Sequence, residues 1–91
     1  MVGKMYKFEW TKQAVKDWER LSQSAYAKKG KELLEMIQDN PYQSPPRFKS
    51  LTGNFKGMYS RRISQQHRLV YEVIEEEKVI LINSMWTHYH E

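Results

Sequence analysis

The stretch SRRISQQHRLVY, residues 60–71, predicts two β-strands joined by a short polar turn. Serine and glutamine fill the turn at residues 64–66, and apolar residues recur on both sides of it. The hairpin carries Arg61, Arg62 and Arg68 but no Asp or Glu. Paired strands bring such side chains close together, and like charges then repel each other unless an anion lies between them. The stretch therefore predicts both a β-hairpin and a negatively charged ligand.

Alternating polar and apolar residues around this hairpin predict four strands in all. The first lies at residues 4–10, and three more follow in succession at residues 55–63, 67–74 and 79–86. Short polar turns join the last three strands. We therefore expect neighbours among these three to pair antiparallel.

Two helices are expected between the first strand and the other three. Thr11 can cap the first helix, in which Ala14, Trp18 and Leu21 recur on one face. The second helix is expected from about residue 24 to residue 39. The order β-α-α-β-β-β predicts an α+β fold, an antiparallel sheet with a two-helix hairpin packed on one face. The other face of the sheet is left available to a ligand.

A long loop, NPYQSPPRFKSLTGN, is expected at residues 40–54, between the second helix and the second strand. It contains the three prolines of the chain and is basic. Proline cannot continue a helix and disfavours helical backbone in the residue before it, which is why the helix should end here. Loops of this length inside a compact domain are often functional.

Charge is segregated along the 91-residue chain, which has the size of a single domain spanning residues 1–91. Residues 40–71 carry six basic residues and no acidic one, a charge of +6, whereas the rest of the chain carries −2, for a net charge of +4. This segregation favours a polyanionic partner, most simply nucleic acid. A solvated basic face without a specific ligand is the alternative.

The composition excludes several kinds of site. The chain has no cysteine, which excludes a disulfide framework and a thiolate nucleophile and suits a reducing cytosol. It shows no phosphate-binding glycine loop, serine nucleophile elbow or metal-ligand spacing, so we expect no cofactor. No apolar run reaches membrane-spanning length, and no signal-peptide core is found at the N-terminus. We therefore expect a cytoplasmic protein with no membrane partner.

The hairpin arginines and the C-terminal residues His88 and Tyr89 are the groups that could carry chemistry. Arginine suits phosphate oxygens, and histidine and tyrosine can transfer protons. Together they indicate a metal-free phosphate reaction, such as attack of an RNA 2′-OH on the adjacent phosphate. The alternatives are structural. Arg61 or Arg62 could pair with Glu72 or with the acidic turn after it, and the C-terminal pair could be ordinary surface residues.

The sequence SRRISQQHRLVYEV, together with the terminal HY pair, resembles the YoeB toxin family of the RelE/ParE superfamily. NPYQSPP and MWTHYHE also resemble members of this family, so the resemblance covers nearly the whole chain. It implies a RelE/YoeB-like fold and a ribosome-dependent mRNA endoribonuclease, an mRNA interferase that acts in the ribosomal A site. It also implies a type II system in which a YefM-like antitoxin neutralises the toxin, operator DNA is bound only through the antitoxin complex, and the toxin forms a homodimer.

Position by position, the resemblance implies roles for individual residues. Arg68 would bind the scissile phosphate and stabilise its developing charge, His88 would be the general acid, and Tyr89 would position the phosphate. The cations expected to hold RNA or the ribosome are Arg47, Lys56, Arg61 and Arg62.

Lys49 departs from the family pattern, because the family usually has a glutamate at this position that serves as general base. Three explanations are open. Lys49 is itself the base, with Arg47 and Arg68 favouring its neutral form; His88 or Tyr89 takes the proton; or the exchange weakens the enzyme.

Two other functions stay open beside the endoribonuclease. A weakly active or inactive member would bind the ribosome or its antitoxin without efficient cleavage, and a ParE-like member would inhibit DNA gyrase. The terminal His88–Tyr89 pair argues against the gyrase inhibitor, because such a protein needs no proton-transfer groups there.

Overall fold

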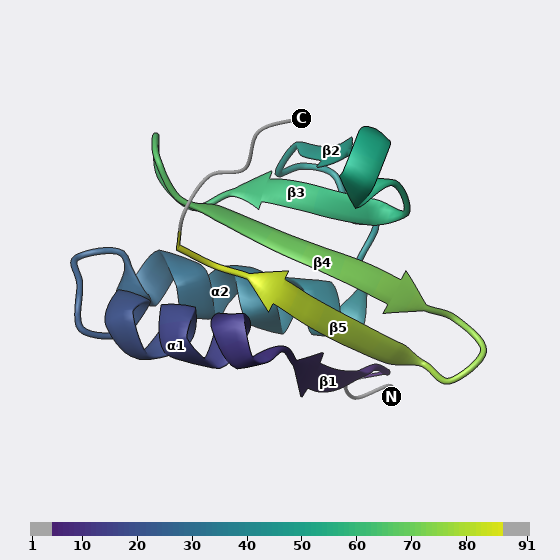
Figure 1. Ribbon diagram of the computed structural model, residues 1–91, viewed down its shortest axis with the longest axis horizontal. Coiled ribbons are helices and arrows are strands. Elements are labelled where there is room, and N and C mark those ends of the chain that lie inside the picture. Colours follow the sequence, from purple (N-terminus) through teal and green to yellow (C-terminus); the bar gives the residue numbers. More distant parts are fainter. Residues whose placement is uncertain (1–4, 87–91) are drawn as a thin grey trace.

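One five-stranded sheet organises the computed structural model, which describes residues 5–86 (Figure 1). The elements follow in the order β1 (Lys7–Trp10), α1 (Lys12–Leu21), α2 (Ala27–Asp39), β2 (Phe48–Ser50), the 3-10 turn η1 (Gly53–Phe55), β3 (Met58–Arg62), β4 (Arg68–Ile74) and β5 (Val79–Ser84). In the sheet the strands lie in the order β1-β5-β4-β3-β2. Strand β1 runs parallel to β5, and the other neighbours are antiparallel. The expected α+β fold is confirmed, and the parallel pairing of β1 with β5 corrects the expectation of a fully antiparallel sheet.

Local sequence explains how α1 begins and how closely α2 packs against it. The Thr11 hydroxyl accepts a hydrogen bond from the Ala14 N–H at 3.0 Å, so Thr11 caps α1 as predicted. The same hydroxyl donates to the Asn83 carbonyl at 2.9 Å, which ties the start of α1 to β5. On α2, a Cβ added at Gly30 would lie 2.6 Å from the end of the Leu21 side chain, so a larger residue there would force that side chain to shift.

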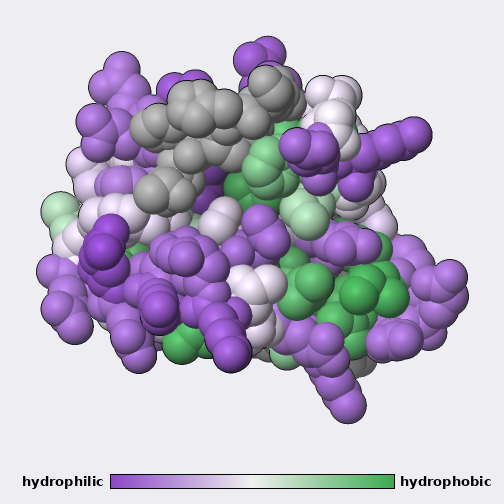
Figure 2. Space-filling view, viewed as in Figure 1, coloured by the Kyte–Doolittle hydropathy of each residue, from purple (hydrophilic) through white to green (hydrophobic). Residues whose placement is uncertain are grey.

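Both helices cover the same face of the sheet, and in Figure 1 β4 and β5 pass in front of α2. The core combines apolar residues of α1, α2, β4 and β5, and its fully buried members include Leu21, Ile37, Leu69, Tyr71, Ile80 and Ile82. We call the face that carries no helix the open face. Figure 2 shows the molecule from that side, with hydrophobic residues gathered over the end of β4 and the start of β5 and hydrophilic residues over much of the rest.

The structure corrects the segment that was expected to be a plain loop at residues 40–54. This segment contains strand β2 and the first residues of η1. Strand β2 was missed because three residues are too short for an alternation signal, and it pairs with β3 alone. Strand β3 begins at Met58 and not at residue 55, since Gly57 has φ of +95°, a left-handed conformation that interrupts a strand.

Candidate functional site

Four basic side chains meet on the open face, where β3 ends and β4 begins. Across the ladder Arg62 lies opposite Arg68, and Lys49 lies opposite Ser60. Paired residues point to the same face, as do residues two apart along a strand, so Lys49, Arg62 and Arg68 share one side of the sheet. Arg47, just before β2, joins them in the lining of one pocket. They line a pocket of about 470 Å³, which we call the Arg68 pocket; its described lining is Arg47, Phe48, Lys49, Ser60, Arg62 and Arg68.

The Arg68 pocket is strongly cationic. Among residues 5–86, no carboxylate lines it and no acidic side chain forms an ion pair with Arg47, Arg62 or Arg68. Arg47, Lys49 and Arg62 are exposed and Arg68 is half-buried, so a ligand can reach them. Guanidinium groups present planar pairs of N–H donors that match phosphate oxygens. The pocket is therefore suited to bind a phosphate group.

Arg61, which was predicted to hold RNA, lies on the helix side of the sheet with 1% of its surface exposed. Its Nε donates to the Tyr71 hydroxyl at 3.0 Å. Its terminal nitrogens donate to the carbonyl oxygens of Pro41, Gln43 and Pro46 at 3.1, 2.8 and 2.7 Å. These bonds use the guanidinium to fix the loop before β2, so Arg61 is not available to RNA. Within residues 5–86 it pairs with no carboxylate either, which was the alternative considered from the sequence.

Of the other predicted site residues, the structure describes Lys56 alone. Lys56 is exposed at the end of η1 and is not part of the lining. His88 and Tyr89 lie outside the residues that the structure describes. Their roles stay predictions.

Two buried polar residues hold the chain just before that C-terminal pair. Asp17 of α1 accepts a hydrogen bond from the Met85 backbone N–H at 2.9 Å. His67 Nδ1 is hydrogen-bonded to the Trp86 carbonyl oxygen, and the two rings stack with centroids 4.1 Å apart. Because a carbonyl oxygen only accepts, Nδ1 must carry the proton.

Sequence reasoning missed both anchoring residues. The bonded partners are 68 and 19 positions apart in the chain, and no local pattern shows such contacts. A signal did exist for Asp17, which stands on the apolar face of α1 with Ala14 and Leu21. A carboxylate in that position needs a hydrogen-bond partner, and this requirement could have marked it.

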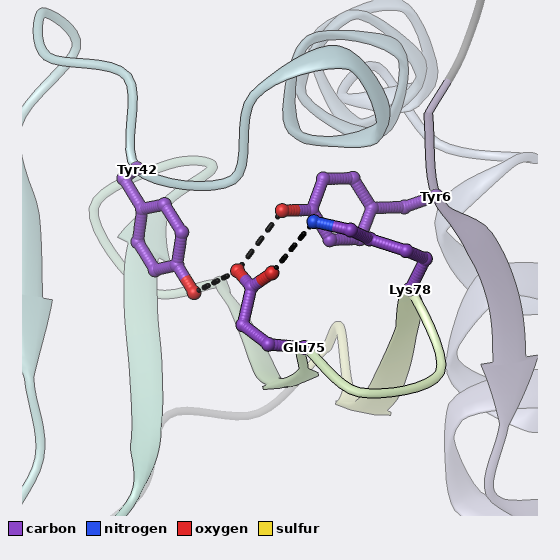
Figure 3. A network of polar contacts seen from close by, with 4 residues as sticks. All are labelled: Tyr6, Tyr42, Glu75 and Lys78. Atoms are coloured by element: carbon purple, nitrogen blue, oxygen red, sulfur yellow. Dashed lines mark hydrogen bonds and ion pairs between the residues drawn. The ribbon is translucent and has the colours of Figure 1, made fainter.

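A polar network around Glu75 holds the loop that leads into the pocket (Figure 3). The hydroxyls of Tyr42 and Tyr6 donate to Glu75 Oε2 at 2.6 and 2.9 Å, and Lys78 Nζ donates to Oε1 at 2.9 Å. These bonds, that from Tyr42 first, lower the pKa of Glu75 to about 2. Desolvation, and then the bond to Glu75, raise the pKa of Tyr42. The turn between β4 and β5 is thereby tied to the loop that supplies Arg47.

Cations dominate the described lining of the Arg68 pocket, with one hydroxyl and one aromatic ring beside them. Within residues 5–86, no three His, Cys, Asp or Glu side chains are grouped so that they could hold a metal ion. The same part of the chain contains no helix long and apolar enough to cross a membrane.

Comparison with known proteins identifies the family. Residues 10–89 match the family described as YoeB-like toxin of bacterial type II toxin-antitoxin system. The toxin YoeB of Escherichia coli strain K12 is 36% identical over 62 residues, which cover 68% of this chain and 71% of that protein.

Solved structures agree with this match. A chain of the YoeB–YefM complex from Staphylococcus aureus is 34% identical with a TM-score of 0.78, over 92% of this chain and 98% of that one. A YoeB/ParE toxin from Agrobacterium tumefaciens is 26% identical with a TM-score of 0.83, over 91% and 99%. An archaeal RelE–RelB complex from Pyrococcus horikoshii, at 23% identity and a TM-score of 0.73 over 96% and 99%, shares the fold. The chain thus belongs to the family of YoeB-like toxins of bacterial type II toxin–antitoxin systems.

Proposed function

We propose that this protein is an mRNA endoribonuclease that cuts mRNA in the ribosomal A site by metal-free attack of the RNA 2′-OH, and so inhibits translation in the cytoplasm. The observation that carries the proposal is the Arg68 pocket, in which four basic side chains converge and no carboxylate belongs to the described lining. Cationic donors aimed at a phosphate stabilise the negative charge that grows on it during the reaction. Membership of the YoeB-like toxins supports the same reaction.

Arg68 and Arg62 are the residues that would act on the scissile phosphate. They lie opposite each other in the ladder between β3 and β4, so both guanidinium groups can reach oxygens of one phosphate. Removing one donor to a transition-state oxyanion typically costs about 10²–10³ in rate. His88 as general acid and Tyr89 as positioning group complete the proposed site, and both roles rest on the family resemblance.

The test adds the purified protein to ribosomes that carry a defined mRNA with an open A site, and maps the new RNA 3′ ends. We expect a cut in the A-site codon that leaves a 2′,3′-cyclic phosphate. Arg68→Ala should reduce the cut by about 10² or more. Lys16→Ala, which removes an exposed lysine from α1, serves as the control and should cut normally.

Lys49 stands where the family usually has its glutamate base, so substituting it tests how the site takes the proton. It lines the same pocket as Arg68, within reach of RNA bound there. If Lys49 is the base, Lys49→Glu lowers the cleavage rate; if the lysine weakens the site, the same substitution raises it. Lys56→Glu makes the same charge change outside the pocket and is the control. An unchanged cleavage rate in Lys49→Glu would contradict both explanations, Lys49 as the base and Lys49 as a weakening exchange. His88 or Tyr89 would then be left as the base.

A binding-only toxin is the second candidate, and Lys49 in place of the family glutamate is the observation that favours it. Ribosome binding without a cut, lost in Arg68→Ala, would establish this reading. A protein that neither binds nor cuts would overturn both functions.

A YefM-like antitoxin is the proposed protein partner, because the S. aureus relative is solved as a YoeB–YefM complex. An acidic, partly disordered antitoxin segment would complement the Arg68 pocket. Toxin and antitoxin together would bind operator DNA, and a homodimer is a further expectation because S. aureus YoeB is solved as a dimer. We expect the antitoxin to abolish ribosome binding in a sedimentation assay. Unchanged ribosome binding by the complex would contradict a shared surface.

A further inference from the structure

A second pocket lies where β3 ends, on the side of the sheet that faces α2. Its volume is about 620 Å³, larger than that of the Arg68 pocket. Lys29 and Leu33 of α2 line it together with Pro46 and Arg47 of the loop and residues 61–65 at the end of β3. We call it the Lys29 pocket. Neither the family resemblance nor the sequence patterns pointed to it.

The Lys29 pocket carries three exposed cations beside its apolar lining. Lys29, Arg47 and Arg62 are exposed, whereas the apolar side chains of Leu33 and Ile63 keep only 3% and 5% of their surface exposed. No carboxylate belongs to its lining within residues 5–86. Phosphate oxygens would meet three cations there, and each contact would add a favourable charge interaction. The surroundings favour a phosphodiester ligand.

The start of α2 adds positive potential to this pocket. Lys29 lies in the first turn of the helix, which contains no acidic residue, and the N-cap residue Tyr26 makes no side-chain capping hydrogen bond. The positive end of the helix dipole is therefore not compensated by a side chain of that turn. The ring of Tyr26 contacts the ring of His67, with centroids 5.4 Å apart, which holds this end of the helix beside the start of β4.

Arg47 and Arg62 line both pockets. The Arg68 pocket lies on the open face and the Lys29 pocket on the helix side, so these two arginines mark the edge where one pocket passes into the other. A chain of phosphates could run from Arg68 around this edge to Lys29 and meet cations at each step.

From this arrangement, and resting on the proposed function, we propose that the Lys29 pocket binds the sugar-phosphate backbone of RNA adjoining the strand held in the Arg68 pocket. Flanking mRNA and ribosomal RNA present the same phosphodiester chemistry and are the two possible sources. Because Lys29 is not part of the lining of the Arg68 pocket, it should contribute to binding and leave the cleavage rate of bound RNA unchanged.

The experiment compares Lys29→Ala with Lys28→Ala and Lys31→Ala. The two control variants remove the same charge from exposed positions of the same helix that line neither pocket. Binding to ribosomes is measured at several salt concentrations. We expect Lys29→Ala to weaken binding about three- to tenfold near physiological salt and to reduce the slope of log K against log salt by about 0.7–0.9, the value for one lost phosphate contact. The controls should change affinity less than twofold.

Two arms identify the source of the phosphate. A trinucleotide RNA is compared with a longer single-stranded RNA, and ribosomes with mRNA are compared with ribosomes without it. If Lys29→Ala loses affinity for the longer RNA but not for the trinucleotide, the pocket binds flanking mRNA. If Lys29→Ala loses affinity for ribosomes alone, whether or not mRNA is present, the pocket binds ribosomal RNA.

Two outcomes would overturn the inference. One is that Lys29→Ala behaves like Lys28→Ala in every arm. The other is that it weakens binding of the YefM-like antitoxin alone, which would assign the pocket to a protein partner. The binding measurements do not depend on RNA cleavage. Failure of the proposed reaction would therefore show in the mapped RNA 3′ ends, whereas failure of this inference would show in the salt dependence of binding. Lys29 is exposed, and an unchanged Tm in Lys29→Ala confirms that the fold is intact.

Discussion

Arg61 and Arg62 are neighbours in β3, yet their surroundings are opposite. Arg61 faces the helices, is buried, and donates to Tyr71 and to three backbone carbonyls. Arg62 faces the other way, is exposed, and lines both cationic pockets. Successive side chains of a strand point to opposite faces. One step along the chain thus separates an arginine that stabilises the fold from one that can bind a ligand.

The comparison also shows that a buried arginine needs no carboxylate. Residues 41–47 form no helix or strand, so their carbonyl oxygens need donors from elsewhere. The Arg61 guanidinium donates hydrogen bonds to three of these oxygens. In a sheet, the backbone N–H groups of a neighbouring strand would donate them. The loop that it fixes is the one that carries Arg47 into both pockets.

The largest expected effect comes from Arg61→Met. This change removes every one of those donors. Among residues 5–86, the Gln43 and Pro46 carbonyl oxygens lose the donor that they have here, and the Pro41 carbonyl keeps only the Tyr71 hydroxyl. We expect the free energy of unfolding to fall by about 3 kcal/mol or more, measured by chemical denaturation.

Arg62→Met is the matched control, the same substitution one residue further along. It should leave the free energy of unfolding within about 0.5 kcal/mol of the original value and weaken ribosome binding instead. Equal losses of stability in the two variants would break the comparison, because both arginines would then be structural.

Tyr71→Phe tests the same buried cluster with a smaller effect. The Tyr71 hydroxyl accepts from Arg61 Nε and donates to the Pro41 carbonyl at 2.7 Å. Losing it should cost about 1–2 kcal/mol of unfolding free energy. Tyr59→Phe is the control, since within residues 5–86 the Tyr59 hydroxyl forms no hydrogen bond. A loss as large as that of Arg61→Met would mean that the hydroxyl, and not the guanidinium, fixes the loop.

His67, just before β4, and Arg68, the first residue of β4, repeat the comparison. His67 is buried against Trp86, whereas Arg68 lines the open-face pocket. His88 and Tyr89 follow Trp86 closely in the chain, so we expect His67 to position them. His67→Phe, which keeps an aromatic ring but loses the Nδ1 donor, should lower kcat about tenfold, the loss of roughly one hydrogen bond, and leave KM nearly unchanged.

His67→Asn separates the two contacts, because it keeps a donor and loses the ring. If the hydrogen bond to the Trp86 carbonyl is the important contact, His67→Asn should cut faster than His67→Phe. A change in KM at constant kcat in both variants would contradict a positioning role.

Strand alternation already held the signal that separates Arg61 from Arg62. Residues 59, 61 and 63 share a face, and Tyr59 and Ile63 are apolar, so Arg61 stands on the side that the core requires. Arg62 shares its face with two serines. The hairpin, the helices and the α+β order could be predicted because periodicity and capping are local properties.

What the sequence could not supply were contacts between distant segments. The carbonyl partners of Arg61 lie 15 to 20 positions away in a loop without periodicity. The Lys29 pocket joins α2 to the end of β3, and no pattern within either element indicates their approach. The cations of the Arg68 pocket were predicted as a group because their charge is segregated in the chain, but the group also included Lys56 and Arg61, which the pocket does not contain.

The smallest expected effect concerns pH and the network that holds the other end of the same loop. Hydrogen bonds from Tyr42 first, then Lys78 and Tyr6, lower the pKa of Glu75 from an ordinary 4.5 to about 2. A carboxyl whose pKa is lower in the folded protein stabilises it above the unfolded pKa, and this contribution is lost as pH falls from about 4.5 to about 2. Stability measured from pH 6 to pH 2 should therefore fall more steeply in the original protein than in Glu75→Gln. Glu76→Gln, an exposed neighbour in the same turn, should keep the original pH dependence. If Glu75→Gln also keeps the original pH dependence, the Glu75 network does not stabilise the loop. The hydrogen bonds of Arg61 would then be what holds the loop that carries Arg47.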